Sequence, residues 1–146
     1  MKIAVLSDIH GNYIALHTVL EDAKRQGVDH LFLLGDQLGY FYRAKEVFER
    51  IKNWSFDMIS GNHERLFLEY LSASETRKKE INSKYGSCFS HYETQFSETL
   101  INEIKQLPEE MIVTKDDMSF FLCHGSPSDK DQYIYPDASL EVLNAN

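Results

Sequence analysis

The sequence predicts an α/β protein whose first sheet is mostly parallel. Short apolar runs alternate with longer stretches in which apolar residues recur at helical spacing. Apolar runs without polar alternation are typical of strands buried on both faces of a parallel sheet. Strand–helix–strand units of roughly thirty residues imply right-handed crossovers, which bring the carboxyl ends of the strands to one edge. At 146 residues, we expect a single domain over residues 1–146.

The first unit begins with an apolar run at residues 2–6, which is followed by Asp8 and His10. In an extended chain, alternate side chains point the same way, so this carboxylate and imidazole are expected to converge. Asn12 then serves as N-cap for a helix predicted over residues 13–27. Open α/β sheets bind ligands beyond the carboxyl ends of their strands, although a polar turn is the ordinary alternative for one Asp-x-His.

Two further units repeat this arrangement. The strand predicted over residues 31–34 ends in Gly-Asp. After a helix over residues 44–51, the strand predicted over residues 56–60 ends in Gly-Asn-His. Because parallel strands place these ends along one edge, their polar side chains should meet. The side chains expected there are Asp8, His10, Asp36, Asn62 and His63.

The second half of the chain departs from this alternation. The charged run at residues 75–80 is expected to be a solvated helical face, and residues 96–107 carry a clearer helical stripe. Residues 111–114 and 118–123 predict two strands joined by a tight turn, which indicates a second, antiparallel sheet layer. The last strand ends in His124 and a glycine.

Composition restricts the partners. Asp and Glu number 23 against 15 Lys and Arg, for a formal net charge of −8. This field repels nucleic acid and anionic membranes, so neither is an expected partner. An anionic substrate would need local positive charge, which bound cations can supply. Two cysteines allow at most one disulfide, and no apolar run reaches signal-peptide or membrane-spanning length, so we expect a cytoplasmic location.

Four strand ends carry side chains that can bind a metal. Asp, Asn and His offer the mixed oxygen and nitrogen donors that suit Mn²⁺, Fe or Zn²⁺ better than Ca²⁺, and the adjacent glycines allow tight turns. In their order and spacing, these motifs resemble the calcineurin-like metallophosphoesterase superfamily, and in particular its small bacterial and archaeal phosphodiesterase-like branch. The matching motifs are Asp8-Ile9-His10, Gly35-Asp36-Gln37-Leu38-Gly39, Gly61-Asn62-His63-Glu64 and His124-Gly125.

The resemblance implies a fold and a ligand set. The fold would be an α-β-β-α sandwich, and two divalent cations would lie at the strand ends. Asp8 and His10 would hold one cation, Asn62 and His124 would hold the other, and Asp36 would bridge both. Mn²⁺ is the first expectation, with Fe, Zn²⁺, Ni²⁺ and Co²⁺ as alternatives.

The resemblance also implies a catalytic role for His63, which is not a ligand in the family pattern. It would stabilise the transition state or protonate the leaving alkoxide, with Asp8 or Glu64 nearby to orient it. Arg65 is expected either to contact the phosphate or to be a solvated arginine. The expected substrate contacts are Asn62, His63 and Arg65.

The function implied is a metal-dependent phosphoesterase. Two cations would activate a hydroxide that hydrolyses phosphodiesters or small phosphomonoesters, with a phosphorylated small molecule or nucleotide as substrate. The alternative is a non-catalytic or impaired interaction module, because the superfamily includes a scaffold subunit of retromer. The aromatic residues 40–42 are expected to pack in the core more often than to form a pocket wall.

Family members continue to a Gly-His-x-His motif, whereas no histidine follows His124 here. We therefore expect a fold truncated at its C-terminus, with remaining ligands supplied from elsewhere or activity impaired. Each cation would lack one imidazole, which predicts weak metal binding. At least one sheet edge would be unpaired, which predicts self-association, element swapping or marginal stability, with residues 133–146 poorly anchored.

Overall fold

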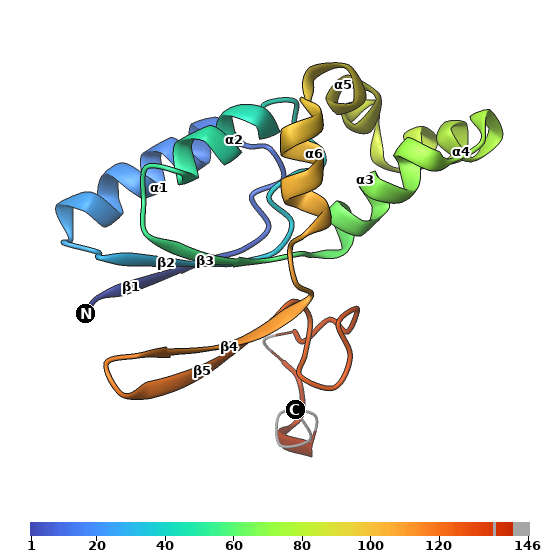
Figure 1. Cartoon of the computed structure of the whole chain (residues 1–146). Coiled ribbons are helices and arrows are strands. Elements are labelled where there is room, and N and C mark those ends of the chain that lie inside the picture. The colour runs from blue at the N-terminus through green and yellow to red at the C-terminus, as the bar shows by residue number, and fades with distance from the viewer. Residues whose placement is uncertain (136, 142–146) are drawn as a thin grey trace.

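Three parallel strands form the sheet that carries the predicted site. The computed structural model describes residues 1–135 and 137–141 (Figure 1). Its strands β1 (Ile3–Leu6), β2 (His30–Leu34) and β3 (Phe56–Ile59) lie in the order β1-β2-β3. The parallel register pairs Leu6 with Leu33 and Leu34 with Ile59, so the carboxyl ends of the three strands share one edge. The α/β class and the mostly parallel first sheet are confirmed.

Two helices cover one face of this sheet. They are α1 (Tyr13–Arg25) and α2 (Ala44–Ile51), both above the strands in Figure 1. The helix α1 begins where the Asn12 side chain accepts a hydrogen bond of 3.1 Å from the Ala15 N–H, which confirms the predicted N-cap. The apolar stripes of these helices pack on the sheet, because apolar surface gains about 25 cal/mol per Å² when it leaves water. The fully buried members of this contact include Leu20, Leu31, Leu33, Val47 and Ile51.

Four further helices extend the same layer. They are α3 (Asn62–Ser72), α4 (Glu75–Tyr85), α5 (Cys88–Gln95) and α6 (Glu98–Lys105). The charged run lies on α4 and faces solvent as predicted, while Ile81 of that helix is buried. The helix α5 was not predicted, because it is short and its buried residues are two aromatics and a cysteine among polar residues. No helix within the described ranges is both long and apolar enough to cross a membrane.

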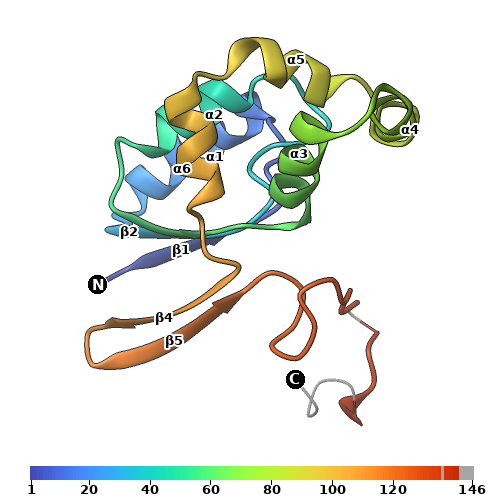
Figure 2. The same ribbon diagram turned by 45° about the vertical axis from the view of Figure 1, so that its right-hand side comes forward.

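The predicted hairpin forms the second sheet layer. Strands β4 (Glu110–Lys115) and β5 (Met118–Cys123) pair antiparallel on the sheet face opposite α1 and α2 (Figure 2). Asp116 and Asp117 join them with φ of 47° and 63°, the left-handed backbone that a tight two-residue hairpin turn requires. A small second core lies between the layers and contains Phe32, Ile59, Val113 and Leu122.

Some strand edges and one face of the two sheets remain exposed. Within the described residues, β1 pairs only with β2, and β5 pairs only with β4. Each of these strands therefore has one unpaired edge, in agreement with the expectation of at least one. On the outer face of the hairpin, Ile112 and Phe121 lie opposite each other and are 73% and 43% exposed. Residues 136 and 142–146, part of the segment expected to be poorly anchored, lie outside the described residues.

We predict that the chain self-associates at high concentration through this apolar surface. Replacing Ile112 and Phe121 together by Thr should lower the mass measured by light scattering, because Thr suits a strand and removes exposed apolar area. The control is Ile14→Thr, which alters an isoleucine on α1 that is 70% exposed and should leave the mass unchanged. A monodisperse wild-type monomer would contradict the prediction.

Candidate metal centre

Asp36 lies just beyond β2, between two imidazoles from distant parts of the chain. Its Oδ2 atom is 3.8 Å from Nε2 of His10, which follows β1, and 3.8 Å from Nε2 of His124, which follows β5. Its Oδ1 atom accepts a hydrogen bond of 2.8 Å from the backbone N–H of His63. Asp8 Oδ1 lies 3.7 Å from the same His10 nitrogen. The strand ends therefore bring these five residues together.

The potential ligand atoms form two groups that share Asp36. Those of His10, Asp36 and His63 lie within 4.8 Å of one another, as do those of Asp8, Asp36 and His124. Two donors bound to one cation at about 2.0–2.2 Å are on the order of 3–4 Å apart, so each group has suitable spacing for one ion. The grouping differs from the expected ligand sets, in which Asp8 accompanies His10 and His63 is not a ligand.

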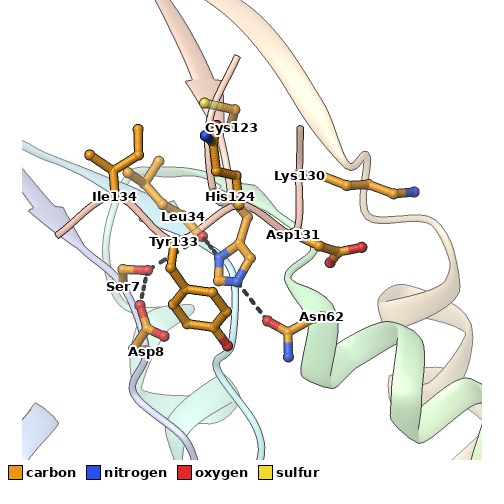
Figure 3. A pocket seen from close by; sticks show the side chains of 12 residues that line it. Ser7, Asp8, Leu34, Asn62, Cys123, His124, Lys130, Asp131, Tyr133 and Ile134 are labelled. Carbon is orange, nitrogen blue, oxygen red and sulfur yellow. Dashed lines mark hydrogen bonds between the residues drawn. The ribbon is translucent and has the colours of Figure 1, made fainter. Parts of the chain in front are cut away.

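Backbone carbonyls orient both outer imidazoles. His124 Nδ1 lies 2.7 Å from the carbonyl oxygen of Leu34, and His10 Nδ1 lies 3.3 Å from that of Leu38. Because a carbonyl only accepts, each Nδ1 carries a proton, which leaves Nε2 of each ring free to turn a lone pair inward toward a cation. His124 Nε2 faces Asn62 Oδ1 at 2.9 Å (Figure 3), so a proton, or a cation in its place, lies between this nitrogen and the amide oxygen. Metal-bound histidines commonly have this arrangement.

Three of these residues have a strained backbone. Asp8, His10 and Asp36 have φ of 55°, 50° and 56°, in the left-handed region that non-glycine residues seldom adopt. The expectation that Asp8 and His10 lie on an extended chain was therefore wrong. Their side chains still converge, because their N–H groups donate to the carbonyls of Gly35 and Asp36 at 3.2 and 2.8 Å. Such strain is characteristic of functional sites, where the surrounding structure compensates for it.

Glu64 is fully buried and holds the backbone of this centre. Its carboxylate accepts four hydrogen bonds of 2.8–3.2 Å. The donors are the backbone N–H groups of Asp36, Gln37, Leu38 and Gly61. The expectation that Glu64 orients the His63 ring was wrong, because both of its oxygens are engaged by the backbone. The capping-box pattern, in which a glutamate at the third helical position reaches back to the residue before the helix, could have indicated this role.

The imidazole ring of His63 packs among other rings. Its side chain is 2% exposed, and its Nδ1 atom has no hydrogen-bond partner among the described residues. The ring centres of His10, Tyr40 and Tyr85 lie 4.5–5.4 Å from its own. Burial, together with the neighbouring His10, lowers the pKa of His63 to about 4. The imidazole is therefore uncharged at neutral pH and can donate an N–H hydrogen bond.

Gly39 lets two imidazoles approach the loop after β2. Its φ is 141°, which L side chains rarely adopt, and a Cβ added there would overlap the Nδ1 atoms of His10 and His63. A side chain at this position would therefore displace both rings. This gives a physical reason for the glycine in the Gly-Asp-x-x-Gly motif.

Arg65 is occupied by carboxylates. It forms an ion pair with Asp131 and lies 3.8 Å from Glu109, which Lys130 also contacts at 2.6 Å. Its Nη1 atom is buried and has no hydrogen-bond partner within the described residues. These ion pairs attach the segment after β5 to the start of α3. Contact between Arg65 and a phosphate stays a prediction and requires the guanidinium to exchange Asp131 for the ligand.

A cavity of about 370 Å³ adjoins the centre. Asp8, Asn62 and His124 line it together with Lys130 and Tyr133 from the segment after β5 (Figure 3). A volume of this size accommodates a small organic ligand beside the candidate ions.

Comparison with known families agrees with this geometry. Residues 1–143 match the model of the calcineurin-like phosphoesterase superfamily domain. The chain belongs to this superfamily. The match covers all the strand-end motifs, so the resemblance predicted from the sequence is confirmed.

Individual relatives are longer than this chain. An uncharacterized protein of Methanocaldococcus jannaschii, MJ0912, is 30% identical over 148 residues, which cover 97% of this chain and 57% of the relative. The metallophosphoesterase of Sphaerobacter thermophilus is 30% identical with a TM-score of 0.71, covering 92% of this chain and 51% of that one. The hypothetical protein PH1004 of Pyrococcus horikoshii OT3 shares the fold at a TM-score of 0.78 and 24% identity, covering 98% and 62%.

We predict that Glu64→Gln lowers the free energy of unfolding by about 2–5 kcal/mol, measured by urea denaturation. Glutamine has the same shape, but its NH₂ group would face two backbone donors and leave both unsatisfied, at about 1–3 kcal/mol each. The control is Glu69→Gln on the exposed face of the same helix, which should change stability by no more than about 0.5 kcal/mol. Equal stability of the two variants would show that the four hydrogen bonds contribute little.

A second prediction concerns how the free energy of unfolding depends on pH in the metal-free protein, measured in EDTA. Because the pKa of His63 falls from 6.5 to about 4 on folding, the stability it contributes is complete above about pH 6.5 and is lost toward pH 4. Between pH 7 and 4.5, the wild type should therefore lose about 1–2 kcal/mol more than His63→Gln. Parallel stability curves for the two proteins would contradict the buried, neutral imidazole.

Proposed function

We propose that this chain hydrolyses phosphate esters with the help of two divalent cations held at the strand ends. One observation carries the proposal: the Asp36 carboxylate lies between His10 and His124, with its Oδ2 atom equally distant from both Nε2 atoms. A carboxylate in this position can be shared by two ions. Family membership supports the reaction class, while the substrate and the metal are part of the proposal.

The donor atoms fit a cation centre. Burial raises the pKa of Asp36 to about 6 and also raises that of Glu64, because both carboxylates are removed from water. Cations close to Asp36 would offset this cost and would separate the facing acceptors of His124 and Asn62. The mixture of imidazole, amide and carboxylate donors favours Mn²⁺, with Fe, Zn²⁺, Ni²⁺ and Co²⁺ as alternatives.

We assign the ligands as the family pattern implies. Asp8, His10 and Asp36 would hold one ion, and Asp36, Asn62 and His124 would hold the other. Bound cations would lower the pKa of the attacking water and neutralise charge on the phosphate. This local positive charge would also let a chain with a net charge of −8 attract an anion.

His63 would act on the phosphate beside this centre. Its uncharged ring can donate an N–H hydrogen bond to a phosphate oxygen, and the negative charge of the substrate would favour a second proton that could pass to the leaving alkoxide. Asn62 would contact the same phosphate. Arg65 would add a positive charge if it left Asp131. The substrates would be phosphodiesters or small phosphomonoesters, including nucleotides, with the phosphate at the strand ends beside the adjoining cavity.

The proposal predicts Mn²⁺-dependent turnover of bis-p-nitrophenyl phosphate or p-nitrophenyl phosphate. His63→Asn should reduce kcat by about 10²–10⁴-fold, the usual contribution of a general acid, while Mn²⁺ affinity stays closer to that of the wild type. Asp36→Asn should instead lose metal affinity by about 10–100-fold or more.

Asp22→Asn is the matched control, because this carboxylate lies on the exposed surface of α1 and should leave turnover unchanged. Two results would contradict the proposal. The wild type could show no turnover, or the wild type and Asp36→Asn could show equal turnover. The first of these results would favour the non-catalytic interaction module.

A further inference from the structure

Three adjacent aromatic residues follow the candidate metal centre and remain exposed. Tyr40, Phe41 and Tyr42 are 51%, 52% and 52% exposed, so the expectation that they pack in the core was wrong. Exposed aromatic rings next to a polar site leave apolar area available to a ligand. The three rings differ in what they contact.

Tyr40 alone of the three adjoins the centre in the described structure. Its ring centre lies 4.8 Å from that of His10 and 4.9 Å from that of His63. A second tyrosine, Tyr85, lies at the end of α4. Its ring centre is 6.3 Å from that of Tyr40 and 5.4 Å from that of His63. Tyr42 instead packs against His91 on α5, at 5.4 Å between ring centres. Tyr40 and Tyr85 therefore form an aromatic wall directly beside His63.

The backbone that carries Tyr40 is fixed on both sides. The hydroxyl of Tyr92, a fully buried residue of α5, lies 2.6 Å from the carbonyl oxygen of Gly39 and also contacts that of Phe41. The N–H of Phe41 donates to the carbonyl of His10 at 2.9 Å. Tyr40 is thus held in place by its neighbours while half of its side chain faces solvent. A fixed, exposed ring loses little conformational entropy when a ligand stacks on it.

A positive charge lies near this wall. Lys84 Nζ is 4.8 Å from the centre of the Tyr85 ring. In a chain of net charge −8, a cation over the Tyr85 ring complements a ligand that combines a flat ring with negative charge.

We infer that Tyr40, supported by Tyr85, binds a planar ring of the group esterified to the phosphate, as a nucleobase would provide. The inference rests on the proposed phosphoesterase function and adds a substrate class to it. The phosphate would lie at the strand ends while the base stacks on Tyr40, because every base has a π-face and stacking tolerates different bases. Tyr40 would then determine the preference for nucleotides over other phosphate esters.

The test is the binding of two uncleavable ligands that differ in the base alone. Dissociation constants are measured by calorimetry on the Mn²⁺-loaded 146-residue chain for the phosphonate analogues of AMP and of ribose 5-phosphate. The wild type should bind the AMP analogue at least about tenfold more tightly, and Tyr40→Leu should remove about tenfold of this ratio. Using the ratio cancels any effect of the variant on phosphate binding.

Two further variants complete the test. Tyr40→Phe keeps the ring and should keep the preference, whereas Tyr42→Leu removes an equally exposed ring beyond the centre and should not alter it. The inference is overturned if the wild type shows no preference, if neither analogue binds, or if Tyr40→Leu keeps the full ratio. Because no turnover is required, this result is independent of whether p-nitrophenyl esters are hydrolysed.

Discussion

Burial of the Asp36 carboxylate is the constraint on which the rest of this structure depends. A carboxylate removed from water is costly unless donors or cations surround it. Here Oδ1 accepts a hydrogen bond from the His63 N–H. The Oδ2 atom lies 3.8 Å from Nε2 of both His10 and His124, beyond hydrogen-bond distance. Below it, Glu64 accepts four backbone hydrogen bonds and fixes the loop that carries Asp36. The buried carboxylate of Glu64 thus positions the buried carboxylate of Asp36.

The sheet explains why residues so distant in sequence can share one centre. Parallel pairing of β1, β2 and β3 aligns their carboxyl ends, and the hairpin β4–β5 brings His124 to the same edge from the opposite face. Left-handed backbone at Asp8, His10 and Asp36 turns the side chains inward. Such strain persists where surrounding hydrogen bonds over-determine the conformation, and the bonds from residues 8 and 10 to the loop after β2 do so here.

The sequence was sufficient for the features that depend on local periodicity and short spacing. Apolar runs indicated β1 to β3, and the polar residues that follow them indicated which side chains would meet. Features that depend on distant contacts were not predictable in the same way. The Tyr92 hydroxyl reaches a loop more than fifty positions earlier in the chain, and neither hydropathy nor spacing connects the two. Glu64 was expected to orient His63; the capping-box pattern indicates its bond from Gly61, whereas its bonds from the N–H groups of residues 36–38 depend on a loop more than twenty positions earlier.

The central claim is that Asp36 is shared by two metal ions, and metal stoichiometry tests it most directly. Calorimetric titration of the metal-free chain with Mn²⁺ should show two sites in the wild type and in Asp22→Asn. In Asp36→Asn, whose amide can still accept the His63 N–H and preserve the loop, both sites should weaken by at least about tenfold. Loss of one site with the other intact, or unchanged binding at both, would contradict a shared carboxylate.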